Sequence, residues 1–242
     1  MTGTLINVVT VLVGSALGMT IGARLPEKIH ETVVRGLGLV VLMLGMQMAL
    51  GTANPLIPLG SIAVGGILGE WWDIEGGLHR LGGWLEARVS RGGADEAATS
   101  RFIKGYVTTS LLFCVGPLTI LGSIQDGLTG DYRLLAVKSM LDGFAALAFS
   151  ASLGLGVAFS AITVLVIQGG ISLLAAQASA VLTDPMIKEM TATGGVIMLG
   201  LAVSSLLEIK PIRVANFLPA LILAPAIVAA LTALGLPVAP KF

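Results

Sequence analysis

Two ionisable side chains that could act together, Lys138 and Asp142, lie in a run of apolar sequence long enough to cross a bilayer. Residues four apart share one face of a helix, so the two side chains can meet. A charge at membrane depth costs about 2.5–3.5 kcal/mol on insertion scales, and intramembrane ionisable residues commonly bind ions or solutes. We therefore take Asp142 as the best single candidate for a solute or proton site; a structural ion pair near the membrane face is the alternative.

A break in the helical pattern precedes this pair. Gly116 and Pro117 interrupt an apolar run, and proline removes a backbone hydrogen bond. In hydrocarbon a freed carbonyl is tolerated only against protein or a wet cavity. Ser123, Gln125 and Asp126 follow within three turns and could bind an ion or solute together with those carbonyls.

Asp126 and Asp131 bracket a short polar turn. The two carboxylates fit a binding role, or a solvated turn in which Asp131 caps the following helix. Asn7, Gln47 and Gln168 are single polar residues in other apolar runs. For these three we expect hydrogen bonds between helices rather than solute contacts.

Composition identifies the class of protein. The chain has 242 residues, of which 55% are hydrophobic and 12% charged, whereas a soluble domain has about 25% charged residues. Long apolar runs predict an all-α, polytopic transmembrane helical bundle whose partner is the lipid bilayer, and not a β-barrel with short alternating segments. The net charge is zero, which gives no support to a nucleic-acid partner. We interpret residues 4–23 as a retained first helix, because no basic residues precede it as in a cleaved signal peptide.

The pattern predicts a single transmembrane domain, residues 1–242, of about eight spans. Amphipathic segments at residues 24–38 and 71–90 are expected to lie at the interface, and residues 91–100 to form a linker. Gly14, Gly18 and Gly22 share a helix face that permits close packing, as do Gly65 and Gly69. The expected spans are residues 4–23, 37–53, 55–69, 104–124, 133–157, 159–182, 187–207 and 215–234.

Two parts of the chain resemble each other. The run VTVLV at residues 9–13 resembles ITVLV at 162–166, and VLMLG at 41–45 resembles VIMLG at 196–200. Residues 1–70 and 158–242 would then be three-helix repeats, separated by the interfacial segment and linker at 71–100 and the central helices at 101–157. An odd number of helices separates the starts of the copies, so they would be inverted in the membrane, an arrangement typical of secondary transporters. Chance similarity between apolar segments is the alternative.

Basic residues predict the topology. With eight spans, ten of the fourteen lysines and arginines fall on one side and four on the other. The richer side is expected to be cytoplasmic, which places both termini outside.

Features of enzymes are missing from the sequence. There is no HExxH or GxSxG motif, and the turn at residues 127–131 is one residue too long for the GxGD of intramembrane aspartyl proteases. His79 has no accompanying ligand cluster, so a surface histidine is the simpler interpretation. We expect neither catalysis nor a cofactor or metal.

The segments GPLTILGSIQDGLTGD (residues 116–131) and KSMLDGFAALAF (residues 138–149) resemble a bacterial family of multi-pass membrane proteins, the YdfK/YqgA-like domain-of-unknown-function family 554. The resemblance covers essentially the whole chain and implies a location in the bacterial cytoplasmic (inner) membrane. It brings no substrate or catalytic residue with it. It singles out motif positions that include Gly116, Pro117, Ser123, Gln125, Asp126, Lys138 and Asp142.

These observations favour a secondary transporter of an ion or small polar solute. An ion channel is one alternative. A membrane-embedded sensor or scaffold that binds a partner through residues 71–100 is another. The glycine-rich faces also permit a homo-oligomer.

Overall fold

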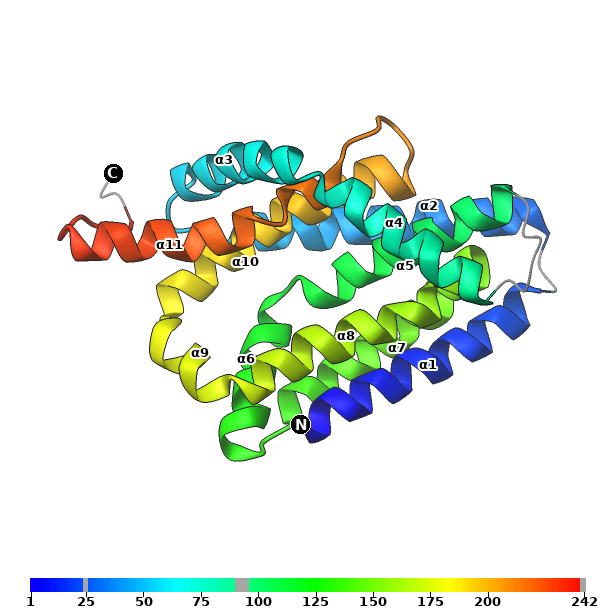
Figure 1. Ribbon diagram of the computed structural model, residues 1–242, viewed down its shortest axis with the longest axis horizontal. Coiled ribbons are helices and arrows are strands. Elements are labelled where there is room, and N and C mark those ends of the chain that lie inside the picture. The colour runs from blue at the N-terminus through cyan, green and yellow to red at the C-terminus, as the bar shows by residue number, and fades with distance from the viewer. Residues whose placement is uncertain (24–25, 90–95, 240–242) are drawn as a thin grey trace. The chain divides into compact units, whose positions relative to one another are not determined.

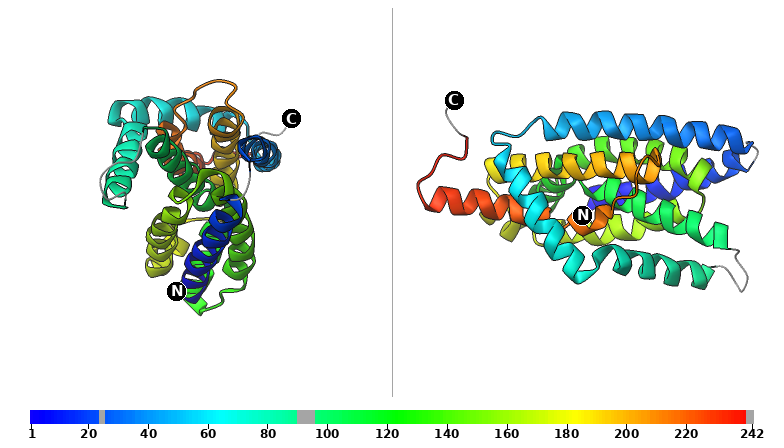
Figure 2. Two further views of the ribbon diagram at one scale, coloured as in Figure 1. Left: turned by 90° about the vertical axis from the view of Figure 1, so that its right-hand side faces the viewer. Right: turned by 90° about the horizontal axis from the view of Figure 1, so that it is seen from above.

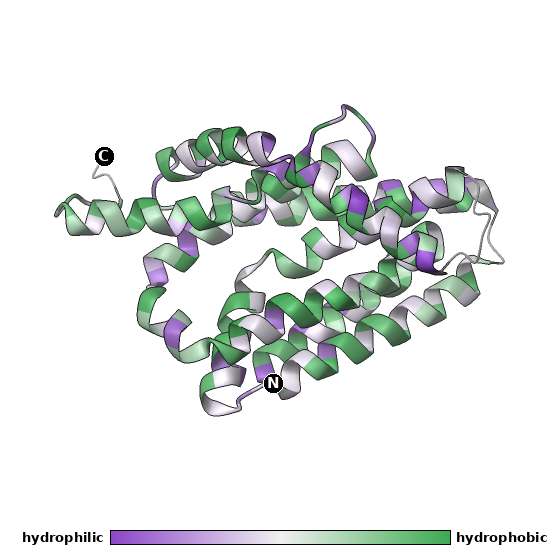
Figure 3. Cartoon of the chain, in the orientation of Figure 1, coloured by the Kyte–Doolittle hydropathy of each residue, from purple (hydrophilic) through white to green (hydrophobic). Residues whose placement is uncertain are grey.

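The computed structural model describes residues 1–23, 26–89 and 96–239, and within these ranges the chain is helical without strands (Figure 1). The predicted all-α fold is confirmed. Apolar residues run along most of α1, α8 and α11 (Figure 3). The helices are α1 (Thr2–Gly22), α2 (Glu27–Ala49), α3 (Leu56–Trp72), α4 (Ile74–Val89), α5 (Glu96–Cys114), α6 (Pro117–Thr129), α7 (Arg133–Leu153), α8 (Gly156–Leu173), α9 (Ala175–Val181), α10 (Asp184–Leu201), η1 (Ala202–Leu206), η2 (Val214–Phe217) and α11 (Ala220–Ala233).

Several predicted boundaries differ from the structure. Of the predicted interfacial segment at 24–38, residues 24 and 25 lie outside the described ranges, and residues 27–38 do not form a separate helix, because α2 continues from Glu27 to Ala49. Trp71 and Trp72 end α3 rather than begin the next helix, since Asp73 adopts a left-handed conformation (φ 48°) and stops α3. The predicted span at 159–182 is divided into α8 and α9 at Leu174. Of the predicted linker, residues 91–95 lie outside the described ranges, and residues 96–100 are helical.

Contacts divide the chain into two compact units. Unit 1 comprises Met1–Leu37, Gly77–Cys114 and Leu118–Ala178, and unit 2 comprises Gly38–Gly76, Val115–Pro117 and Ser179–Phe242. Unit 1 is thus built on α1 and α4–α8, and unit 2 on α3, α10, α11 and the second part of α2. Figures 1 and 2 show the helices of each unit from three directions.

Unit 1 is organised by the glycine face of α1 against α7. A Cβ atom added at Gly14 or Gly18 would collide with the backbone carbonyl of Gly143 or Leu147, and one at Gly22 with the backbone of Ala151. This confirms the close packing predicted for the three glycines. From each of these contacts to the next, the residue number rises by four on α1 and by four on α7, so the two helices run parallel.

That parallel packing bears on the number of spans. Six helices in the described ranges are long and apolar enough to cross a membrane, and α5 with α6 forms a seventh candidate bent by 63°. Two parallel helices need an odd number of crossings between them, and α2 and the bent pair supply two. We infer that α3, an apolar helix of 17 residues and about 26 Å, supplies the third. Length and composition alone support six spans, or seven with the bent pair, and the eighth of the predicted spans rests on this inference.

Unit 2 packs α3 against η2 and α11, also through glycine. A Cβ atom at Gly65 would meet the backbone of Ala220, and one at Gly69 the backbone of Asn216. Ile57 of α3 and Ala224 and Val228 of α11 form a buried apolar cluster. The packing role predicted for Gly65 and Gly69 is confirmed.

Candidate functional site

The predicted pair of Lys138 and Asp142 forms inside unit 1. Lys138 donates a hydrogen bond to Asp142 Oδ2, and Asn7 Nδ2 of α1 donates to the same oxygen at 2.9 Å. The side chains of all three residues are buried, with at most 8% of each residue exposed. The expected interhelical hydrogen bond of Asn7 is confirmed, and it joins α1 to α7 at the charged pair.

Helix geometry places this group near the centre of a span. Asp142 follows Arg133, the first residue of α7, by nine residues and about 14 Å, and α7 ends at Leu153. An unpaired charge there would be costly, and pairing with further hydrogen bonds offsets part of that cost. Lys138, Asp142 and Asn7 thus make a polar group without net charge that could exchange its bonds with a polar solute.

Asp126 forms a second polar centre in unit 1. Its Oδ2 accepts a hydrogen bond from the backbone N–H of Gly3 and lies 3.1 Å from the amino group of Met1. Ser123 lies one turn earlier on the same face of α6, and both residues are buried. Gln125, in contrast, is exposed, so the structure does not bring it into this group.

The other carboxylate of the polar turn has a structural place. Asp131 is half-buried, and its Oδ1 accepts the backbone N–H of Arg133 at the start of α7, at 3.1 Å. The N-cap of α7 is Tyr132 and not Asp131 as predicted, so Asp131 stabilises the turn one residue before the cap. Asp126 is the buried member of the two.

The helix break lies where the sequence predicts it. α5 ends at Cys114, Gly116 has φ 158°, and α6 begins at Pro117, whose side chain is not among those described. Thr119 Oγ1 donates to the carbonyl of Phe113 at 3.2 Å, so one carbonyl near the break is bonded within the protein. A solute-binding role for the Gly116–Pro117 backbone stays a prediction.

Sequence reasoning missed a buried carboxylate in unit 2. Glu189, in the second turn of α10, is fully buried, and its oxygens accept from Thr52 Oγ1 at 2.5 Å and from the backbone N–H of Ala53 at 2.6 Å. The signal available was a single acidic residue in a predicted span. Nothing near it in the sequence identifies Thr52 or Ala53 as its partners.

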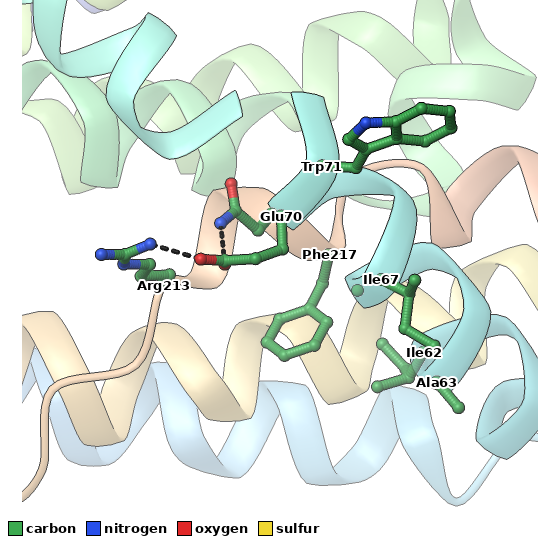
Figure 4. A pocket seen from close by; sticks show the side chains of 9 residues that line it. Ile62, Ala63, Ile67, Glu70, Trp71, Arg213 and Phe217 are labelled. Carbon is green, nitrogen blue, oxygen red and sulfur yellow. Dashed lines mark hydrogen bonds and ion pairs between the residues drawn. The ribbon is translucent and has the colours of Figure 1, made fainter. Parts of the chain in front are cut away.

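A pocket of about 740 Å³ opens beside α3 in unit 2 (Figure 4). Its lining is mostly apolar, with Ile67 and Phe217 among the wall residues. Glu70 bonds Arg213 and also accepts from Asn216 Nδ2 at 2.5 Å. Because these polar groups bond one another, they tie α3 to η2 and the residue before it.

The sequence matches one known protein family over nearly its whole length. A family model described as "Protein of unknown function (DUF554)" matches residues 2–229. The chain is 29% identical over 240 residues to the uncharacterized membrane protein YdfK of Bacillus subtilis, covering 98% of this chain and 99% of that protein. It is 34% identical over 232 residues to the uncharacterized protein YqgA of Escherichia coli, covering 96% and 97%. No solved structure matches.

Proposed function

The chain belongs to the DUF554 family and is similar to a membrane protein of Bacillus subtilis, and we propose that it is a secondary transporter of an ion or small polar solute. The solute would bind in unit 1 at Asn7, Lys138 and Asp142, with Asp126 close to one end of the path. The single observation that carries the proposal is the buried Lys138–Asp142 pair, bridged by Asn7 at the middle of a span. Groups of this kind commonly line ion and solute pathways in membrane proteins.

The helix packing supports the proposed inverted repeats. In such repeats, helices that correspond run in opposite directions. The start of α1 lies against the end of α8, since a Cβ at Gly169 would be 4.0 Å from Thr4 Cγ2. Likewise Gly45 packs against Gly195, while Gly38, closer to the start of α2, packs against Leu206, farther along the chain.

The third pair of helices behaves in the same way. Along α3, Gly65 packs on Ala220 and Gly69 on Asn216, so the partner numbers fall as the α3 numbers rise. The offset of 155 residues that relates Gly45 to Gly200 also relates Gly65 to Ala220. All three corresponding pairs, α1 with α8, α2 with α10 and α3 with α11, therefore pack antiparallel. Transporters with inverted repeats hold their solutes near the midplane and move them by alternating access.

Uptake by proteoliposomes tests the proposal. Purified wild-type protein and the Asp142→Asn variant would be reconstituted and supplied with labelled Na⁺, amino acids and organic acids across a pH range. We expect saturable uptake of one class by wild type and none by Asp142→Asn, because the variant removes the carboxylate of the buried pair. Glu31→Gln, at an exposed ion pair with Arg35, is the matched control and should transport normally.

The other outcomes of this experiment point to different functions. Ohmic currents without saturation would replace the carrier with a channel. No flux of any kind by a folded wild-type protein would overturn the transport proposal and favour the sensor or scaffold. Full activity of Asp142→Asn would remove that carboxylate from the mechanism.

Localisation in the inner membrane with both termini outside belongs to the same proposal. The excess of basic residues on the opposite side supports it. Reporter fusions at each end test it: a reporter active only outside the cytoplasm should work at both termini. Opposite results at the two ends would contradict an even number of spans.

A further inference from the structure

Unit 1 contains an unusual set of buried polar atoms without hydrogen-bond partners. Apart from Ser15, which lies farther along α1, they belong to Thr4, Asn7, Ser123, Asp126 and Gln168, of which none is more than 2% exposed. The atoms are the hydroxyl oxygens of Thr4 and Ser123, the Oδ1 atoms of Asn7 and Asp126, and both amide atoms of Gln168. Most buried polar groups in native proteins are bonded, so a group of unpaired atoms calls for an occupant.

Contacts between three helices bring four of these residues to one region. The N–H of Gly3, next to Thr4, bonds Asp126 of α6. A Cβ atom added at Gly169 of α8, next to Gln168, would lie 3.2 Å from Met1 Cε and 4.0 Å from Thr4 Cγ2. Ser172 Oγ, one turn after Gln168, donates to the carbonyl of Ser123 at 3.0 Å. The start of α1, the end of α6 and the end of α8 therefore meet around Thr4, Ser123, Asp126 and Gln168.

The chemistry of this group favours a cation. Oxygen atoms dominate its unpaired set, and the amide of Gln168 can turn its oxygen toward an occupant because neither amide atom is committed to a partner. α6 ends at Thr129 and α8 at Leu173, so two helix C-termini, which carry partial negative charge, meet one helix N-terminus, that of α1, which carries partial positive charge. An anion would find the hydroxyl and amide donors of Thr4, Ser123 and Gln168, but also the Asp126 carboxylate, which has its own sign.

Charge and ligand type narrow the class of cation. Oxygen ligands suit hard cations, whereas transition metals prefer histidine and cysteine. In the described part of the chain, no three His, Cys, Asp or Glu side chains gather as a metal cluster. Calcium sites use several carboxylates, and here one carboxylate oxygen is unpaired, with the amino group of Met1 near the other. These features fit a single positive charge.

We propose that Thr4, Ser123, Asp126 and Gln168 bind a dehydrated alkali cation, Na⁺ or K⁺. Asn7 lies one turn after Thr4 on α1 and bonds Asp142, so it links the cation site to the charged pair. The identification of this cation as the coupling ion rests on the proposed transport function. The cation site itself does not.

Thermal unfolding of the purified full chain in detergent tests the site without any transport assay. NaCl, KCl or choline chloride would be titrated at constant ionic strength. A ligand bound only by the folded state raises the melting temperature with concentration. We expect a saturable rise with Na⁺ or K⁺ and none with choline, and the cation that acts at the lower concentration identifies the preferred ion.

Gln168→Leu separates this proposal from a structural role. Leucine removes the unpaired amide, so we expect this variant to melt at a higher temperature than wild type in choline and to lose the cation-dependent rise. Gln47→Leu, at an exposed glutamine of α2, is the matched control and should keep the rise. Thr4→Val, which keeps the shape of the side chain, should weaken cation binding at least about tenfold, the effect of one lost polar ligand.

Two results would overturn the proposal. One is a wild-type protein whose melting temperature is the same in Na⁺, K⁺ and choline. The other is an unchanged cation response in both Gln168→Leu and Thr4→Val. Cation binding by a protein that carries no solute would instead retain this site and refute the transport function.

Discussion

Two buried carboxylates, Glu189 in unit 2 and Asp126 in unit 1, are held in different ways. Glu189 uses both oxygens, bonded by Thr52 and the Ala53 N–H. Asp126 leaves Oδ1 unpaired, and unpaired atoms of Thr4, Ser123 and Gln168 lie on the helices that meet around it. In unit 2, Ser61 is the one described residue with such an atom. Burial alone thus does not mark a functional carboxylate. The unused hydrogen-bonding capacity around it is the more informative sign.

Substitution of Glu189 should give the largest loss of stability. Glu189→Ala strands the N–H of Ala53 and the hydroxyl of Thr52, at about 1–3 kcal/mol for each unsatisfied group. We expect the melting temperature in detergent to fall by at least about 5 °C, with the response to alkali cations retained. Glu31→Gln, at an exposed ion pair, should change the melting temperature by less than about 2 °C. If Glu189→Ala were as stable as wild type but no longer responded to alkali cations, Glu189 would be a cation ligand and not a structural carboxylate.

The glycine contacts predict similar losses in both units. Gly18→Ala would press a methyl group onto the Leu147 carbonyl, and Gly69→Ala onto the Asn216 backbone. Overpacking of this kind costs about 1–3 kcal/mol. Gly170→Ala meets nothing within 4 Å and should be neutral or slightly stabilising, because alanine favours helix. Equal melting temperatures for all three variants would refute the close packing of α1 on α7 and of α3 on η2.

The smallest effect is expected at two buried serines, one in each unit. The hydroxyl oxygens of Ser15 and Ser61 are unpaired, but neither serine belongs to the cation site described above. Ser15→Ala and Ser61→Ala should each change the free energy of unfolding by less than about 1 kcal/mol and leave the cation response intact. A lost cation response in either variant would show that unpaired atoms elsewhere contribute, and would widen the site.

Local spacing predicted much of this arrangement. The four-residue separation of Lys138 and Asp142 was enough to predict their pairing, and that of Gly14, Gly18 and Gly22 to predict a packed face. Both follow from the period of a helix. The points at which helices begin and end were predicted less accurately. Proline marked the start of α6, whereas Asp73 ends α3 by a left-handed conformation that its sequence context did not suggest.

The long-range partners could not be predicted. Asn7 and Asp142 are 135 residues apart, and Thr52 and Glu189 are 137 apart. Such pairs depend on which helices pack together, and a single apolar sequence permits many packings. Gln168 carries the same lesson, because it was expected to bond a neighbouring helix and has no partner. The absence of a partner can be recognised only after the surrounding helices are placed.

The central claim is that unit 1 keeps its buried polar groups for a solute rather than for its fold. Replacing both members of the charged pair, in Lys138→Met/Asp142→Leu, tests this most directly. Apolar replacement of a buried pair is commonly neutral or stabilising, whereas loss of one member strands a charge. We predict that the double variant melts at or above the wild-type temperature, that Asp142→Leu alone melts below it, and that neither supports uptake by proteoliposomes. Wild-type uptake by the double variant would contradict the claim and leave the pair as a structural ion pair.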